Sequence, residues 1–464
     1  VNDIVFDDET RNVYLDQRVD TDFMDLISRN GFTQNHQVSV SGTTERTEYY
    51  FSGGFNSQEG PIIGDDFQRI SVRSRLNVDV TKWLEIGLDG TYNNNDYSGL
   101  AASMRNAYMN APIGYPYRYD GMPFNVNSAT GTQLERYPTG GSVQNPLWGT
   151  DGTVEDIDKS NFFRFAGHAL INVPKIEGLS YRLDYSINAS FSIQDRFYFE
   201  DYYVGEAGPG NYIERYSDAA LQTRLSQANG YNDRVNDHTY IINNILNYKK
   251  AINDHYIDAT LVATRDYSYM KLVSLNGSDF SANGNTQLGV NGIHKAGVLT
   301  SNLDIIEKAN VGYLARASYA FKDRYHVTAS IRRDGSSVFG VDKKFGNFPS
   351  FGLAWTISEE SFLNGSNYID FLKLKASYGK NGNQGVEPYG TLARVNSGSD
   401  GGIRYEFGDN PSEILYGVQL STLANPNLGW ETTTSFNGGF QSALLGNRVF
   451  LDLDFYFSKT EPCL

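Results

Sequence analysis

Apolar and polar residues alternate along many stretches of this chain. In RISVRSRLNVDV, residues 69 to 80, every second residue from Ile70 onward is apolar except Ser74, and the residues between them are polar. The pattern recurs in 84 to 92, 181 to 191 and 447 to 458. A period of two predicts β-strands with one apolar and one polar face. For a single stretch, a half-buried strand of a soluble antiparallel sheet is the usual interpretation.

The number and length of these stretches favour a membrane β-barrel instead. We predict fourteen strands, many of them near or above the length of about ten residues that a tilted membrane strand requires. The predicted strands are 36 to 43, 46 to 56, 67 to 80, 82 to 94, 160 to 173, 178 to 192, 238 to 250, 254 to 269, 311 to 322, 324 to 334, 348 to 358, 371 to 380, 432 to 444 and 447 to 459.

The connections between the predicted strands alternate in length. Short turns such as VTKW and FKDR alternate with long polar segments at 57 to 66, 95 to 159, 193 to 237, 270 to 310, 335 to 347 and 381 to 431. The connection at 359 to 370 is intermediate in length and belongs to the short-turn side. A soluble sandwich or propeller has no reason to gather its long loops at one end. An outer-membrane barrel does, because its periplasmic turns are short and its extracellular loops are long.

Composition narrows the classes of function. The chain has 464 residues, and Tyr (32), Phe (27) and Gly (46) are abundant while Pro (13) is sparse, which suits long strands with glycine-rich connections. The net charge of -15 argues against nucleic acid as a partner. The single cysteine, Cys463, excludes an internal disulfide framework, and the six scattered histidines show no metal-ligand spacing. We therefore expect no metal and no cofactor.

Charged residues on the polar side of the predicted strands indicate a wet surface. In a dry sandwich core they would be costly, whereas they suit a lumen filled by water or by a polar plug; in a one-sided soluble sheet they would be the solvent face. The predicted lumen-lining residues are Arg73, Arg75, Arg182, Asp184, Arg316, Arg332, Asp452 and Asp454. Asp452 and Asp454 would lie roughly 7 Å apart, a spacing that a glycosidase pair can have. Because no catalytic motif accompanies them, we do not predict an enzyme.

Aromatic residues fall near the predicted strand ends, where an outer-membrane barrel carries girdles at the headgroups. They are Trp83, Tyr92, Phe321, Tyr325, Trp355 and Tyr378. At the end of the predicted strand 324 to 334, SIRRDGSS places Arg332 on the polar side and Arg333 at the point where the strand leaves the hydrocarbon layer.

Five stretches together resemble the SusC/RagA family of TonB-dependent outer-membrane transporters. In chain order they are GFTQNHQVSVSGTTERTEYYFSGGFNSQEG (31 to 60), YLARASYAFKDRYHVTASIRRDGSSVFG (313 to 340), FGNFPSFGLAWTISEESFL (345 to 363), LKLKASYGKNGNQ (372 to 384) and NPNLGWETTTSFNGGF (425 to 440). The resemblance implies an all-β fold, an antiparallel transmembrane β-barrel of outer-membrane type. It further implies twenty-two strands, of which about fourteen are present here.

The resemblance also implies that the chain is a partial barrel. We expect residues 1 to 30 to be the remnant of the first extracellular loop and residues 31 to 464 to be the partial barrel. The long extracellular loops are then 95 to 159, 193 to 237, 270 to 310 and 381 to 431. The plug domain is expected to be absent from this chain, and KTEPCL at its end departs from the family pattern.

The function implied by the resemblance is import of large nutrients, oligosaccharides or peptides, across the outer membrane. The implied partners are a SusD-like surface lipoprotein and the TonB–ExbB–ExbD complex, which acts through the plug and its TonB box; outer-membrane lipid surrounds the barrel. The alternative is a secreted or surface carbohydrate-binding or adhesin-like β-sheet protein without transport activity.

Two groups of residues are candidates for binding the substrate. Tyr115, Tyr117 and Tyr119 occupy alternate positions of a loop, and stacking on sugar rings competes there with a loop packed on its own tyrosines. Asn381, Asn383 and Gln384 open another long loop, where ordinary strand-end turn chemistry is the competing interpretation.

Overall fold

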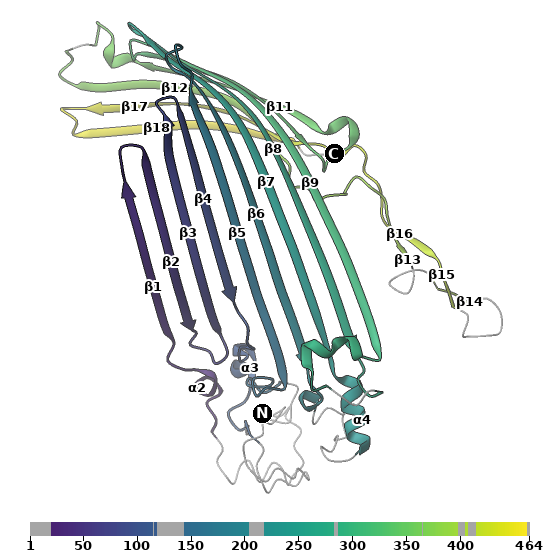
Figure 1. Ribbon diagram of the computed structural model, residues 1–464. Helices are drawn as coiled ribbons and strands as arrows, with labels where there is room; N and C mark the ends of the chain where they lie inside the picture. The colour runs from purple at the N-terminus through teal and green to yellow at the C-terminus, as the bar shows by residue number, and fades with distance from the viewer. Residues whose placement is uncertain are drawn as a thin grey trace.

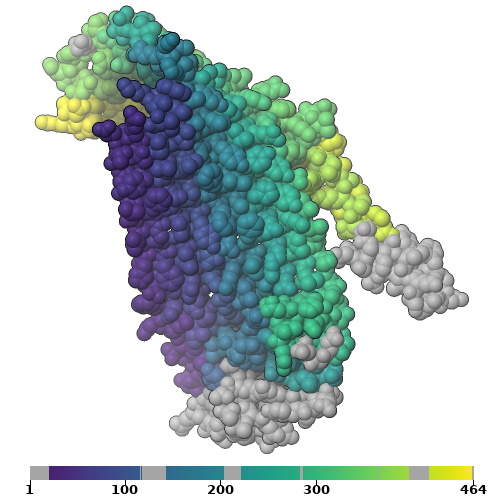
Figure 2. Space-filling view, viewed as in Figure 1, coloured from purple at the N-terminus to yellow at the C-terminus, as the bar shows by residue number. Residues whose placement is uncertain are grey.

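The computed structural model contains one large curved antiparallel sheet (Figure 1). It describes residues 20–114, 116–117, 143–203, 218–282, 286–363, 365–397, 404–406 and 414–461. Fourteen strands form the sheet, and each pairs with the next one along the chain. In the space-filling view the colours of the first nine strands therefore run in chain order, from purple to green, across the visible surface (Figure 2). The predicted all-β antiparallel architecture with fourteen strands is confirmed.

Every predicted strand corresponds to one strand of this sheet. The strands are β1 (Phe32–Thr43), β2 (Thr47–Glu59), β3 (Asp66–Thr81), β4 (Leu84–Asp96), β5 (Val154–Asn172), β6 (Leu179–Tyr198), β7 (Asn229–Ile252), β8 (His255–Ser278), β9 (Val298–Phe321), β10 (Tyr325–Ser336), β11 (Phe345–Thr356), β12 (Ile369–Asn383), β17 (Glu431–Leu444) and β18 (Val449–Glu461). Strands β7, β8 and β9 have 24 residues each and extend well beyond the predicted bounds.

The connections alternate between the two ends of the sheet, as predicted. One end, here called the short-turn end, carries turns such as 253–254 and 322–324 and the longer segment 357–368 with η4 (Ile357–Glu359). Both Lys322 and Asp323 have positive φ, which suits a tight hairpin connection. The other end, the long-loop end, carries the helices α2 (Phe23–Ile27), α3 (Met104–Met109) and α4 (Asp218–Gln227) (Figure 1).

The long loops form small cores of their own. Phe23 and Ile27 of α2 pack with Ala107 of α3 and with Leu147. A second cluster joins Phe197 and Phe280 to residues of α4 and of η2 (Gly289–Lys295). The β12–β17 connection instead forms two short ribbons that stand away from the sheet (Figure 1), β13 (Arg394–Ser397) with β16 (Val418–Thr422) and β14 (Arg404–Glu406) with β15 (Ile414–Tyr416). No helix within the described ranges is long and apolar enough to cross a membrane.

The sheet has one apolar and one polar face. Residues directly opposite each other in neighbouring strands point to the same side, so the pairing of Arg75 with Asp89 and of Val72 with Tyr92 fixes both faces at once. Following these pairs from β1 to β18 puts Val72, Ile331 and Leu453 on the apolar face, where they are 50%, 52% and 47% exposed. Exposed apolar side chains over a whole face are expected where lipid covers that face.

Two rows of aromatic rings border the apolar band. Near the short-turn end, His255, Phe321, Tyr325 and Trp355 follow one another on four neighbouring strands, with ring centroids 4.8, 6.4 and 6.3 Å apart. Towards the long-loop end, pairs such as Tyr240 with Tyr267, 5.4 Å apart, form the second row. From His255 to Tyr267 a strand rises about 40 Å, or roughly 28 Å at a 45° tilt, which agrees with an apolar band about 25 Å tall.

Candidate functional site

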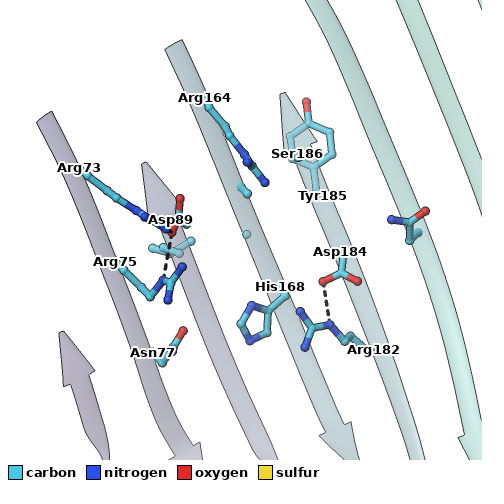
Figure 3. A pocket seen from close by; sticks show the side chains of 14 residues that line it. Arg73, Arg75, Asn77, Asp89, Arg164, His168, Arg182, Asp184, Tyr185 and Ser186 are labelled. Carbon is cyan, nitrogen blue, oxygen red and sulfur yellow. Dashed lines mark hydrogen bonds and ion pairs between the residues drawn. The ribbon is translucent and has the colours of Figure 1, made fainter. Parts of the chain in front are cut away.

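A groove of about 580 Å³ lies on the polar face, across strands β3 to β6 with one residue of β7 (Figure 3). Its charged and imidazole side chains are Arg73, Arg75, Asp89, Arg164, His168, Arg182 and Asp184. They alternate with residues of the apolar face along each strand, which is why one surface collects so many of them.

The register of the strands sets these side chains at matching heights. Asp89 lies directly opposite Arg75 on one side, and Thr91 two residues further is opposite Arg164 on the other. His168 is opposite Asp184 in the next pair of strands. Four strands therefore bring together residues that lie far apart in the sequence. Arg73 and Asp184, for example, are 111 positions apart.

Positive charge is in excess in this groove. The Asp89 carboxylate accepts hydrogen bonds through one oxygen, Oδ2, from Arg73 Nη2 at 3.2 Å and from Arg75 Nε at 3.1 Å. Arg182 Nε donates to Asp184 Oδ1 at 2.8 Å. No described acidic residue forms an ion pair with Arg164. Four guanidinium groups thus face two aspartates, and spare donors point into the groove.

His168 is held over a glycine. Its Nε2 lies 3.1 Å from Glu85 Oε1 on the neighbouring strand. A Cβ on Gly87 would meet His168 Cε1 at 2.1 Å, so only glycine leaves room for the ring at this place. The ring of His168 thus occupies the space above Gly87, and it is one of the side chains that line the groove.

A second charged cluster lies on the polar face of β12, β17 and β18. Lys375 Nζ is 3.0 Å from Asp452 Oδ1 and 2.9 Å from Asp454 Oδ2. Gln441 donates to the other oxygen of Asp452 at 3.0 Å. A cation that bridges the two carboxylates leaves neither of them free to act as a general acid, so the pair gives no support to a glycosidase site.

The two remaining predicted lumen residues also lie on this face. Arg332 Nε donates to both oxygens of Asp334, two residues away on the same side of β10, at 2.8 and 2.7 Å. Arg316 stands on β9, opposite Ser330 of β10. The structure thus places all eight predicted residues on the polar face and brings four of them, Arg73, Arg75, Arg182 and Asp184, into one groove.

Of the predicted substrate residues, the four that the structure describes, Tyr117, Asn381, Asn383 and Gln384, do not line the groove. Tyr117 belongs to the β4–β5 connection, whereas Tyr115 and Tyr119 lie outside the described residues. Asn383 ends β12; its Oδ1 accepts from Gly385 N–H at 3.0 Å and its Nδ2 donates to Glu431. Asn381 lies opposite Thr433, and Gln384 follows the strand. For Asn383, the contacts are those of strand-end turn chemistry.

Three groove residues, Asp89, Arg164 and His168, were not among the predicted lumen-lining residues. Arg164 and His168 occupy alternate positions in NFFRFAGHALIN, and Asp89 does so in LEIGLDGTY, so the period of two already put them on the polar side. Their meeting depends on cross-strand register, which one strand does not reveal. Within the described parts of the chain, no cluster of three or more His, Cys, Asp or Glu could hold a metal. The side chains of the groove can therefore bind a ligand through hydrogen bonds and charge.

Comparison with known proteins identifies the family that shares this fold. Residues 105–461 match the family described as TonB dependent receptor-like, beta-barrel. TonB-dependent receptor P3 of Formosa agariphila is 28% identical over 463 residues, which cover 97% of this chain and 42% of that protein. TonB-dependent receptor SusC of Bacteroides thetaiotaomicron is 26% identical, with 96% and 42% covered. The solved structure of the RagAB peptide transporter aligns with a TM-score of 0.73 at 22% identity and covers 96% of this chain and 46% of that one. The chain spans about two fifths of the length of these curated relatives.

Proposed function

Because this chain belongs to the family of TonB-dependent receptor-like β-barrels, we propose that it forms part of the wall of an outer-membrane importer for large nutrients. The predicted resemblance to the SusC/RagA family is confirmed, and the protein is one of the outer membrane. The family is one of receptors and transporters, not a class of enzymes.

The observation that carries the proposal is the difference between the two faces of one single-layered sheet. The apolar face is exposed over the height of a bilayer, and the polar face bears the charged groove. Such a sheet is stable only if lipid covers one side and water or polar protein fills the other. The eight predicted lumen-lining residues, on the polar face, would then line the import path.

In this proposal the long-loop end faces outwards. The vestibule is formed by the long loops at 95 to 159, 193 to 237, 270 to 310 and 381 to 431. Residues 1 to 30 belong to the first extracellular loop, and residues 31 to 464 contribute the partial barrel. A SusD-like lipoprotein covers the vestibule, in line with the relative named SusC. Energy comes from the TonB–ExbB–ExbD complex acting on a plug domain inside the barrel.

The cargo is an oligosaccharide or a peptide. Both classes carry the hydroxyl, carbonyl and carboxylate groups that arginine and aspartate side chains bind. RagAB is a peptide transporter, and its structure shares the fold of this chain. Tyr115, Tyr117, Tyr119, Asn381, Asn383 and Gln384 remain proposed contacts of the cargo in the vestibule.

Deletion of the gene tests the proposal. Cells that lack it should lose uptake of fluorescently labelled oligosaccharides or of labelled peptides, and a protonophore should abolish uptake in the wild type. The full-length protein should sediment with membranes and show a heat-modifiable band on a gel. Surface binding of the cargo without uptake in the wild type would favour the adhesin-like alternative and overturn the proposal.

A further inference from the structure

The apolar face carries a furrow that has no role in the proposed import of nutrients. Two adjoining hollows, of about 590 and 440 Å³, open on this face across strands β6 to β11. They share Asn244, Ala263 and Tyr313, so they form one continuous furrow.

Small side chains form the floor of the furrow. Ala263 lies opposite Tyr313, and Ala315 lies between Leu261 on β8 and Ile331 on β10. Because an alanine stands beside a larger apolar residue in each pair, the surface dips between Leu261, Tyr313 and Ile331. The three larger residues are exposed and form the walls. A furrow of this shape on a lipid-facing surface suits a flexible hydrocarbon chain.

Three cations border the end of the furrow nearer the long-loop end. They are Arg333, which lines the first hollow, and Arg265 and Lys344, which line the second. None of the three forms an ion pair with any acidic residue that the structure describes, although the chain as a whole carries a net charge of -15. The guanidinium of Arg333 lies 5.0 Å from the centroid of the Phe345 ring, which positions it over the rim.

The neighbouring residue, Arg332, forms an ion pair within the same strand, in contrast to Arg333. Arg332 points to the opposite face, where both oxygens of Asp334 accept from its Nε. Arg333 has no such carboxylate. On its own face, the next acidic residue along β9 is Glu307, two positions beyond the Ala309 that lines the second hollow. An anion that is not part of the described chain would complete this rim.

The height of the rim fits the boundary of the bilayer. Arg265 lies ten residues along β8 from His255 of the aromatic row at the short-turn end. Ten residues rise about 33 Å, or roughly 23 Å at a 45° tilt, which is close to the far edge of an apolar band about 25 Å tall. Phosphate groups of lipids lie at that level, and arginine binds them with two parallel hydrogen bonds.

We infer that this furrow binds one acyl lipid with an anionic phosphate headgroup in the leaflet at the long-loop end. The phosphate lies among Arg265, Arg333 and Lys344, and an acyl chain lies along Ala263 and Ala315. A free anion in water would leave the apolar floor empty, and a lipid without net charge would leave the three cations uncompensated. Both features together therefore select an acyl lipid whose headgroup carries an anionic phosphate.

Lipid retention by the full-length protein tests this inference. The purified protein in detergent is titrated with phosphatidylglycerol, and bound lipid is counted by native mass spectrometry; phosphatidylcholine with the same acyl chains is the comparison. Wild-type protein should retain one phosphatidylglycerol in preference to phosphatidylcholine. Arg333→Gln should weaken retention roughly fivefold, and adding Arg265→Gln should weaken it by a similar factor again.

Two further variants separate charge from shape. Arg316→Gln removes a cation of the polar face on the adjacent strand β9 and should leave retention unchanged. Ala315→Phe fills the floor without a change in charge and should also reduce retention. A heat-modifiable band checks that each barrel has assembled. Equal retention of the two lipids by wild-type protein, or wild-type retention by Arg333→Gln, would overturn the inference.

Discussion

Tyr325 and Glu360 are joined by a 2.5 Å hydrogen bond, in which the tyrosine hydroxyl donates to Oε1 of the carboxylate. Trp355 Nε1–H donates to the same oxygen at 3.1 Å. Both rings belong to the aromatic row at the short-turn end, and Glu360 lies just outside the strands, after η4. One carboxylate thus fixes the polar ends of two rings whose apolar bodies border the lipid.

The first prediction concerns this carboxylate. Its hydrogen bonds, with that from Tyr325 the largest cause, lower the pKa of Glu360. A lowered pKa means that the ionised form contributes stability above the unfolded value of about 4.3 and that the contribution is lost as the pH falls through the folded value. Glu360→Gln should therefore lower the barrel's melting temperature at pH 7, and the difference from wild type should shrink towards pH 4 and below. A difference in melting temperature that stays constant over this pH range would contradict the proposed role of the ionised Glu360 carboxylate.

The second prediction tests the two faces. Val72→Arg or Leu453→Arg places a charge on the apolar face and should cost roughly 2 to 4 kcal/mol near the middle of the bilayer. Ser71→Arg, one residue away on the polar face, is the matched control and should be tolerated far better. The measurement is the free energy of unfolding in micelles, together with the fraction of heat-modifiable protein. Assembly of Val72→Arg as good as that of wild type would show the face assignment to be wrong.

The third prediction concerns the lysine between two aspartates. Lys375→Met leaves Asp452 and Asp454 without their shared cation and should lower the free energy of unfolding only slightly, because the pair is exposed on the polar face. Adding Asp454→Asn to Lys375→Met removes the repulsion between the acids and should restore part of the loss. Denaturant unfolding of the three proteins measures both effects. If the second substitution adds its own full cost, the bridge does not stabilise the wall.

The fourth prediction concerns Gly87. Its substitution by alanine forces His168 away, because the new Cβ would lie 2.1 Å from His168 Cε1. Gly87→Ala should destabilise the protein by about 1 to 3 kcal/mol, as overpacking does. In the double variant Gly87→Ala, His168→Ala part of that cost should disappear, while the contact of the new Cβ with Asn77 Oδ1, at 2.6 Å, remains. A double-mutant cycle from unfolding measurements gives the coupling, and additive costs would mean that the ring does not occupy this place.

The sequence predicted well which residues lie on the same face of the sheet. It predicted less well which residues of different strands come into contact. The period of two identified all fourteen strands and put Arg182 and Asp184 on the polar side. It underestimated β7, β8 and β9 because their outward face turns polar beyond the predicted ends, at residues such as Arg234, Lys271 and Glu307, where the alternation of apolar and polar ends. The groove itself needs the register between four strands, and register follows from turn geometry and pairing over the whole sheet.

The furrow and the bridge at Lys375 escaped prediction for a related reason. Ala263 and Ala315 are unremarkable in sequence and form a floor only because they lie near each other across β8 and β9. Lys375 lies 77 residues from Asp452, and the pairing of β12 with β17 and of β17 with β18 brings them together. Long-range contacts of this kind are fixed by topology.

The length of β7, β8 and β9 has a consequence for encounters at the cell surface. In β8, eleven residues follow Tyr267 before the strand ends at Ser278, and they stay paired on both sides. In the proposed orientation this stretch rises above the lipid as a continuously paired rim, and Leu275 within it packs against the buried cluster of α4 and η2. In this orientation, any large particle that approaches the cell would meet this rim before it meets the bilayer.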